Sequence, residues 1–365
     1  MSSPLAAVAA TRLSLDRTVA WVVAAAAAAQ APWVGQLSPA VLICGVFLPV
    51  WIPELWRNWR TRVVAALMLG AIVNGLVVGR LMAVTHDNSP KMALEQSLLM
   101  IGMLFGIGGL LWAARLIGQP KAAMAYGLGL LANAVVHGFD SDNVWKFTLS
   151  IPIVVLGLGW AWRRSSRGAE VAVLLLLIAI SALNDSRSAA SILLVALALV
   201  LWQVVRTSLN VRSTLLRATV TLSIVVLGAY NLMQVFILEG FLGQGAKARS
   251  EAQIASTGSI LLGGRPEIGA AVALLREYLG GMGLGTLPTF GDVYIAKGGM
   301  YAVNYDPNNG YVENYMFGSR IEVHSVLGDL WLRFGVFGMA TAVAFLLIAL
   351  VGALALIARN RASAL

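Results

Sequence analysis

The stretch HSVLGDLWLRFGVFG (residues 324–338) closes the one long polar interval of this sequence, which runs from Glu239 to Gly338. The chain on either side of the interval consists mainly of apolar runs. We expect those runs to form a membrane scaffold that presents the polar interval on one side of a bilayer. The chemistry of the protein is therefore expected in the polar interval.

The composition is that of a polytopic membrane protein. Apolar residues make up 59% of the 365 residues and charged residues 12%, more apolar surface than a soluble domain can bury. The formal charge of +9 comes from short basic clusters between apolar runs, so we expect no binding to nucleic acid. The single cysteine, Cys44, excludes an intramolecular disulfide and a cysteine metal site. No signal-peptide cleavage site is apparent, so the first apolar run is expected to be retained.

Ten apolar runs approach or reach the roughly 20 residues that a spanning helix needs. They lie at Thr18–Trp33, Ala40–Trp56, Val63–Thr85, Leu98–Ala114, Ala122–Val136, Val144–Trp162, Ala169–Asn184, Ala189–Val205, Ala218–Leu238 and Ser325–Ile357. We predict an all-α fold, a polytopic membrane helix bundle of about ten transmembrane helices with one large, partly helical periplasmic loop. The predicted segments are residues 1–238 with nine helices, 239–324 as the catalytic loop, and 325–365 with the last helix and a cytoplasmic tail.

The lysines and arginines fall in alternate loops, and this pattern fixes the expected orientation. If the N-terminus is cytoplasmic, every inner loop is basic, for example at Arg57, Arg115 and Arg163. Both ends of the chain are then cytoplasmic, and the polar interval lies on the outer side.

Two short helices are predicted within the polar interval, near Gly245–Ala255 and from Pro266 to Leu279. Proline suits the first helical position, where no amide donor is needed. The second helix carries an apolar stripe at residues 268, 272, 275 and 279, so it is expected to lie on the membrane or against the bundle. The turn-forming residues of Asn304–Tyr311 indicate irregular backbone.

Two arginines are candidates for binding an anion. Arg187 lies at the outer junction of two apolar runs, where a guanidinium is costly unless it is paired or faces water, and it would suit phosphate oxygens. An ion pair with Asp185 is the structural alternative. Arg265 follows Gly263 and Gly264 and precedes a helix start, whose free amide donors favour a phosphate. An ordinary helix start is the alternative there.

His324 is the candidate proton acceptor, because histidine exchanges a proton near neutral pH and could activate a sugar or lipid hydroxyl. A purely structural histidine is the alternative. Arg320 and Glu322 flank it, either as a further phosphate-binding group or as a solvated pair. His86 and His137 are also expected outside but carry no distinguishing signal, and no role is assigned to Arg80 or Arg333.

The segment from His324 to Gly338 resembles the signature of the O-antigen ligases and the related O-antigen and exopolysaccharide polymerases. Its pattern of histidine, a small polar residue, nine residues, glycine, two residues and glycine places Ser325, Gly335 and Gly338 at motif positions. The Arg187 and Arg265 segments match more weakly, and the resemblance covers about residues 169–338. The chain departs from the family in having one span, rather than more, after the loop.

The resemblance implies a metal-independent, inverting glycosyltransferase without cofactors in the bacterial inner membrane, with its active site periplasmic. A glycan on undecaprenyl diphosphate would pass to lipid A core, or in a polymerase to another lipid-linked glycan. The resemblance implies that Arg187 and Arg265 hold the diphosphate and that His324 assists the acceptor hydroxyl. A transporter of an anionic lipid or glycan is the alternative from another functional class.

Overall fold

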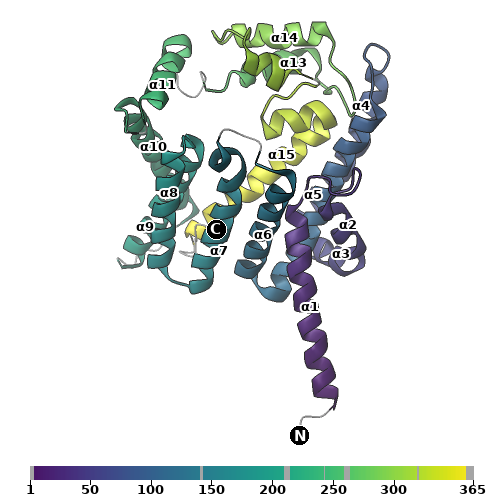
Figure 1. The fold of residues 1–365 in the computed structure, drawn as a ribbon, viewed down its shortest axis with the longest axis vertical. Coiled ribbons are helices and arrows are strands. Elements are labelled where there is room, and N and C mark those ends of the chain that lie inside the picture. Colours follow the sequence, from purple (N-terminus) through teal and green to yellow (C-terminus); the bar gives the residue numbers. More distant parts are fainter. Residues whose placement is uncertain are drawn as a thin grey trace. The chain divides into compact units, whose positions relative to one another are not determined.

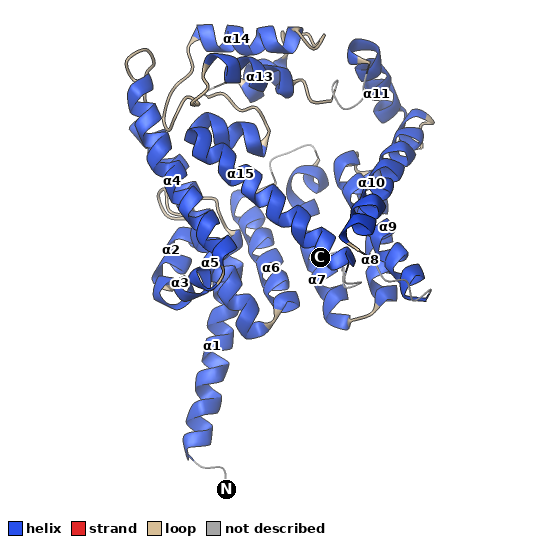
Figure 2. Cartoon of the chain, turned by 180° about the vertical axis from the view of Figure 1, so that it is seen from behind, coloured by secondary structure: helices blue, strands red, loops and turns tan. Residues whose placement is uncertain are grey.

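The structure of the chain is a computed structural model, and it describes residues 4–139, 143–208, 214–241, 243–258, 264–318 and 320–358. These residues form helices and connecting segments without any strand (Figure 2), which confirms the predicted all-α class. The chain divides into two compact units, which are described separately. The first comprises residues 1–58, 102–235 and 350–365, and the second comprises residues 59–101 and 236–349.

Every one of the ten predicted apolar runs contains a helix (Figure 1). Six helical stretches in the described part of the chain are long and apolar enough to cross a membrane, which supports a multi-pass membrane protein. They are α4 (Trp59–Met82), α5 (Pro90–Ile117), η1 with α7 (Trp145–Arg164), α9 (Arg187–Ser208, apolar to Val205), α10 (Leu215–Leu238) and α15 (Val326–Ala358). The expected count of about ten spans is not confirmed.

Two of the remaining apolar runs depart from single straight spans for visible reasons. The run Ala40–Trp56 is broken into α2 (Pro39–Val46) and α3 (Leu48–Arg57), bent by 89°, and it would be a seventh span if the pair crosses as one. Proline near the start of α3 lacks an amide donor and disfavours helical backbone before it. The helix α8 (Arg167–Leu183) has only 17 residues.

In the first unit, close packing depends on small residues. The alanine-rich end of α1 (Pro4–Ala28) is buried, and α6 (Gln119–His137) packs against it. A Cβ placed on Gly129 of α6 would lie 1.9 Å from the Ala25 carbonyl oxygen, so only glycine allows this approach.

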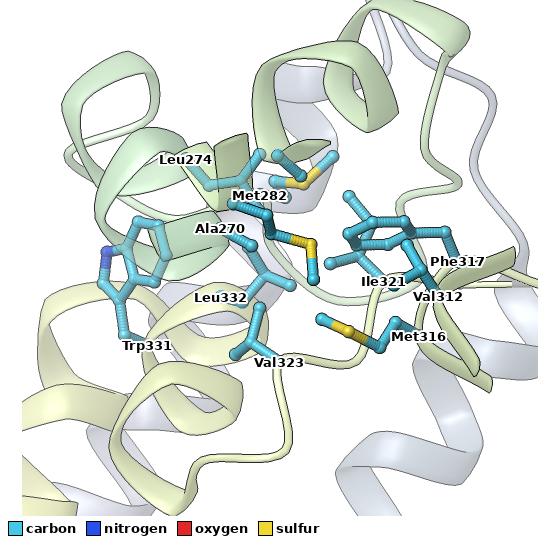
Figure 3. Close-up of a cluster of buried hydrophobic side chains, with 12 residues drawn as sticks. Ala270, Leu274, Met282, Val312, Met316, Phe317, Ile321, Val323, Trp331 and Leu332 are labelled. Atoms are coloured by element: carbon cyan, nitrogen blue, oxygen red, sulfur yellow. The ribbon is translucent and has the colours of Figure 1, made fainter. Parts of the chain in front are cut away.

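In the second unit, the polar interval folds around an apolar core of its own (Figure 3). The core takes Ala270 and Leu274 from α13 (Glu267–Glu277), Val312 and Met316 from the π-helix η2 (Tyr311–Met316), and Trp331 from α15. This interval is therefore a packed element rather than an open loop.

The helices of the interval agree in part with prediction. The first expected helix is α11 (Gln244–Thr257), and the second is α13, which ends two residues early and has Pro266 just before its first residue. The apolar stripe of α13 is mostly exposed, with Leu279 beyond its end 73% exposed. Sequence reasoning missed α14 (Phe290–Tyr301), which crosses α13 where Gly299 meets Gly269. The expected irregular backbone is confirmed for residues 304–309 but gives way to η2 at Tyr311.

The predicted last span is two helical pieces, because α15 is interrupted at Gly335 with φ 62° and ψ −148°. Only glycine adopts this backbone easily, and a Cβ there would also lie 2.2 Å from Asn74 Nδ2. Asn74 Nδ2 instead donates to the Phe334 carbonyl oxygen at 2.8 Å. The Leu332 carbonyl oxygen accepts from the amides of Met282 and Gly283. The glycine-rich segment after α13 thus satisfies carbonyls that the break exposes.

Gly338, the last glycine of the motif, has a steric role at the same break. A Cβ on Gly338 would lie 2.0 Å from the Leu330 carbonyl oxygen. Gly335 and Gly338 therefore both allow the break in α15, which follows the His324 segment.

Candidate functional site

The segment that carries His324 alternates between core and surface. Ile321 and Val323 are buried in the core of the second unit, whereas Arg320 is exposed and Glu322 and His324 are partly exposed. Alternation of this kind sends successive side chains to opposite sides. Arg320, Glu322 and His324 are therefore the more exposed residues of this segment.

The backbone of His324 is held in the left-handed region, with φ 47°. A histidine with positive φ is uncommon and is maintained only when its surroundings fix it. Asp329 supplies that constraint, because its carboxylate accepts from Val323 N at 3.1 Å and from Ser325 N at 3.0 Å. Ser325 Oγ accepts from Gly328 N at 3.3 Å, so the motif serine caps the start of α15.

The ring of His324 lies on aromatic side chains. It stacks on Tyr315 with ring centroids 4.6 Å apart and an interplanar angle of 26°, and Tyr311 lies at 6.1 Å. Nε2 of His324 is buried and makes no hydrogen bond to any described residue. A buried polar atom without a partner is costly, and it is a candidate for binding a ligand or a reacting group.

A second such atom lies at the start of α13. Glu267 is 6% exposed, and its Oε1 accepts from the Tyr311 hydroxyl at 2.5 Å, while its Oε2 is buried without a partner among the described residues. Burial raises the pKa of Tyr311, and the hydrogen bond to Glu267 and the negative charges nearby raise it further. We call His324, Tyr315, Tyr311 and Glu267 the His324 cluster.

Arg265 is exposed and precedes Glu267 by two residues, in the same unit as His324. Its carbonyl oxygen accepts from Ile268 N at 3.1 Å, which starts the first turn of α13. Gly264 is exposed beside it, and Gly263 lies outside the described residues. Arg265 is therefore close in the chain to the His324 cluster, because it lies two residues before Glu267.

Arg187 belongs to the first unit, where it is the first residue of α9. Its Nε lies 3.7 Å from Asp185 Oδ1, so the ion pair that the sequence left as an alternative is present. The side chain of Arg187 is 24% exposed. Its convergence with His324 stays a prediction.

A different histidine, His86, has a partner at each of its two ring nitrogens. His86 Nε2 lies 3.1 Å from Asp292 Oδ2, and its Nδ1 lies 2.8 Å from the Thr85 hydroxyl. The side chains of His86 and Asp292 are 6% and 1% exposed. The Tyr278 hydroxyl donates to Asp292 Oδ1 at 2.5 Å, and Thr289 donates to Oδ2 through its amide and its hydroxyl.

The Asp292 carboxylate is ionised in this setting. Burial by itself would raise its pKa, but the hydrogen bonds from Tyr278 and Thr289 and the adjacent His86 lower it below the ordinary value. Because a carboxylate only accepts, His86 Nε2 carries a proton toward it. We call His86, Asp292, Tyr278 and Thr289 the His86 cluster, and its partners join α14 to the end of α4.

Several of these residues have a signal in the sequence that was overlooked. Thr289 and Asp292 form a capping box, in which each side chain binds the backbone of the other, and the T-x-x-D pattern marks a helix start. Asp329 has no comparable signal, because its carboxylate binds the amides of Val323 and Ser325 in the turn that precedes α15. Within the described ranges, no group of three or more His, Cys, Asp or Glu side chains is placed to hold a metal ion.

No model of a protein family, no characterised protein and no solved structure matches this chain.

Proposed function

We propose that this protein transfers a glycan from undecaprenyl diphosphate to an acceptor hydroxyl at the periplasmic face of the bacterial inner membrane. The observation that carries the proposal is His324, whose buried Nε2 has no partner among the described residues while Asp329 fixes its backbone on both sides. The resemblance of residues 324–338 to the O-antigen ligase signature supports the same function. Helices long and apolar enough to cross a membrane are compatible with a substrate that is anchored in the bilayer by a lipid.

In the proposed reaction, an acceptor hydroxyl attacks the anomeric carbon of the donor sugar from the face opposite the diphosphate. A C–O bond to the acceptor forms as the bond to the phosphate oxygen breaks, and the configuration inverts. His324 Nε2 takes the hydroxyl proton. Glu267 Oε2 accepts a hydrogen bond from a sugar hydroxyl and so orients the ring, while Tyr311 holds the carboxylate.

The leaving diphosphate carries negative charge that must be stabilised as the bond breaks. Arginine is suited to this because its planar guanidinium binds phosphate oxygens and stays charged. Arg265 and Arg187 are proposed for this role, with Arg320 as a further candidate. The proposal needs neither a metal nor a cofactor.

The acceptor is proposed to be lipid A core, as in a ligase. A polymerase that extends a lipid-linked glycan is the alternative, since both groups share much of the signature. Ligases and polymerases differ in the acceptor rather than in the chemistry at the donor, so the two products distinguish them.

The test is a transfer assay with the purified full chain in detergent. Undecaprenyl-diphosphate-linked glycan serves as donor and lipid A core as acceptor, and Arg265→Ala is compared with Arg276→Ala, another exposed arginine of the same unit. We expect transfer to lipid A core that Arg265→Ala lowers and Arg276→Ala leaves intact. Extension of the donor glycan alone would identify a polymerase. Absence of both products in detergent, together with transport of the unchanged donor across the bilayer by the protein reconstituted in liposomes, would contradict the proposal and indicate a transporter.

A further inference from the structure

Arg333 is an arginine inside an apolar helix. It lies in the first piece of α15, two residues before the break at Gly335, and its side chain is only 19% exposed. A guanidinium in such a position is costly unless it is paired or faces a wet cavity, and it marks a functional site by default.

Its pairing in the structure is incomplete. Arg333 Nη2 lies 3.5 Å from Glu322 Oε1, at the long limit of a hydrogen bond. The same oxygen is 2.5 Å from Arg320 Nε. One carboxylate is therefore shared by two guanidiniums, which leaves a net positive charge. The other N–H donors of both arginines have no partner among the described residues.

Both arginines line a small pocket of the second unit. Gln96 from α5 and Thr286 line it as well, together with apolar side chains such as Met282. Gln96 Oε1 accepts from Gly285 N at 3.0 Å, while its Nε2 remains a donor. The Thr286 hydroxyl donates its only proton to the Met282 carbonyl oxygen, so toward a ligand it can only accept. The side chains of this pocket that can still donate to a ligand are therefore Arg320, Arg333 and Gln96.

The pocket borders the apolar core of the second unit, with which it shares Met282, Ile321 and Leu332. Ile321 and Leu332 belong to the cluster of Figure 3 and also line the pocket, together with their chain neighbours Arg320 and Arg333. The pocket has a volume of about 20 Å³, enough for roughly one water-sized group. One phosphate oxygen fits that space, and the remainder of the phosphate would lie outside, beside the half-exposed Arg320.

We infer that Arg320, Arg333 and Gln96 form a binding site for a phosphate group, carried either by a polyprenyl lipid headgroup or by soluble pyrophosphate. Two guanidiniums and an amide offer the forked donors that phosphate oxygens accept. Glu322 neutralises the site when it is empty and competes with the anion for both arginines. The inference deepens the proposed function, on which its link to the donor diphosphate rests, although phosphate binding itself does not depend on glycan transfer.

The experiment measures binding rather than turnover, with the full chain. One arm follows thermal unfolding in detergent as inorganic pyrophosphate is added, and the other follows unfolding in phosphatidylcholine nanodiscs with and without undecaprenyl phosphate. The variants are Arg333→Gln, Arg320→Gln and Glu322→Gln, and Arg276→Gln is the control for loss of one positive charge in the same unit. If Arg333→Gln does not fold, Arg320→Gln still tests the site, because its side chain is half exposed outside any helix.

We expect wild-type protein to be stabilised in at least one arm, and the responsive arm identifies the source of the phosphate. Loss of either pocket arginine should raise the apparent Kd about ten-fold or more, because each removes charged hydrogen bonds. Arg276→Gln should leave the Kd unchanged, and Glu322→Gln should lower it.

Absence of stabilisation in both arms, equal effects of Arg320→Gln and Arg276→Gln, or weaker binding by Glu322→Gln would each overturn the inference. Phosphate binding that depends on the pocket arginines in a protein without transfer activity would instead retain the inference and reject the proposed function. Glycan transfer by a protein that fails the binding test would instead retain the proposed function and reject the inference.

Discussion

His86 and His324 lie in the same unit, but the hydrogen bonding of their side chains differs. Both ring nitrogens of His86 have partners, and its carboxylate partner is fully satisfied by Tyr278 and Thr289. His324 has strained backbone and a buried Nε2 without a described partner.

The difference separates a structural histidine from a candidate for chemistry. A satisfied buried network stabilises one conformation and leaves nothing free to react. An unsatisfied buried group lowers stability and persists where function requires it. The His86 cluster is therefore expected to govern stability and the His324 cluster to govern activity.

The largest effect is expected from breaking the His86 cluster with Asp292→Ala. The substitution leaves His86 and Tyr278 buried without their acceptor, so the free energy of unfolding should fall by about 3–5 kcal/mol. Thermal and denaturant unfolding of the purified protein measure this loss. Asp87→Ala removes an exposed carboxylate next to His86 and is the matched control, with little expected change. Equal stability of the two variants would show that the cluster is not a structural lock.

The next largest effect is expected from Asp329→Asn, which disturbs the backbone on both sides of His324. An amide side chain offers one acceptor where the carboxylate offers two, so about 1–2 kcal/mol of stability should be lost. Because small displacements of a reacting group reduce rates strongly, transfer should fall roughly ten-fold. Kinetics per folded molecule check this, with Glu251→Gln, in an exposed pair on α11, as control. Unchanged kinetics would separate Asp329 from the site.

A smaller effect is expected from Tyr311→Phe, which keeps the ring and removes the hydrogen bond to Glu267. The loss of one hydrogen bond to a buried carboxylate should cost about 1 kcal/mol or somewhat more. Thermal unfolding measures it against Tyr294→Phe, where the tyrosine is 80% exposed. Indistinguishable variants would mean that Glu267 does not depend on Tyr311.

The smallest effect is expected from mild acid. The pKa of Asp292 in the folded protein lies below its ordinary value of 3.8. Unfolded chains therefore take up this proton more readily, and the stability from Asp292 is complete above that value and is lost as the pH falls through the folded pKa. The difference in melting temperature between wild type and Asp292→Asn should shrink as the pH drops from 5 to 3. A difference that grows on acidification would reverse the assigned shift.

Hydropathy was sufficient to predict the helical fold, and local patterns predicted α11 and α13, but neither predicted that the polar interval packs around a core of its own. It was insufficient for the break at Gly335, since glycine inside an apolar run signals conformational freedom without saying whether the chain uses it. The same limit applies to the bend between α2 and α3. The count of about ten spans stays unconfirmed, since α8, for example, is helical but has only 17 residues.

The candidate site was predictable only where the residue pattern was local. His324, Ser325 and the two glycines follow from one motif, and Arg265 follows from a helix start. The pairing of His86 with Asp292 joins residues 206 positions apart, which no local period reveals. The pocket with Arg333 depends on a break in α15 that brings distant carbonyls and amides together.

The most direct test compares His324→Ala with His86→Ala in the same preparation, measuring glycan transfer per folded molecule together with the melting temperature. We expect His324→Ala to lower transfer by about 100-fold or more while its melting temperature stays near that of wild type. His86→Ala should lower the melting temperature and keep most of the transfer. Retention of transfer by His324→Ala, or its loss only in proportion to unfolding, would contradict the assignment of His324 as the proton acceptor.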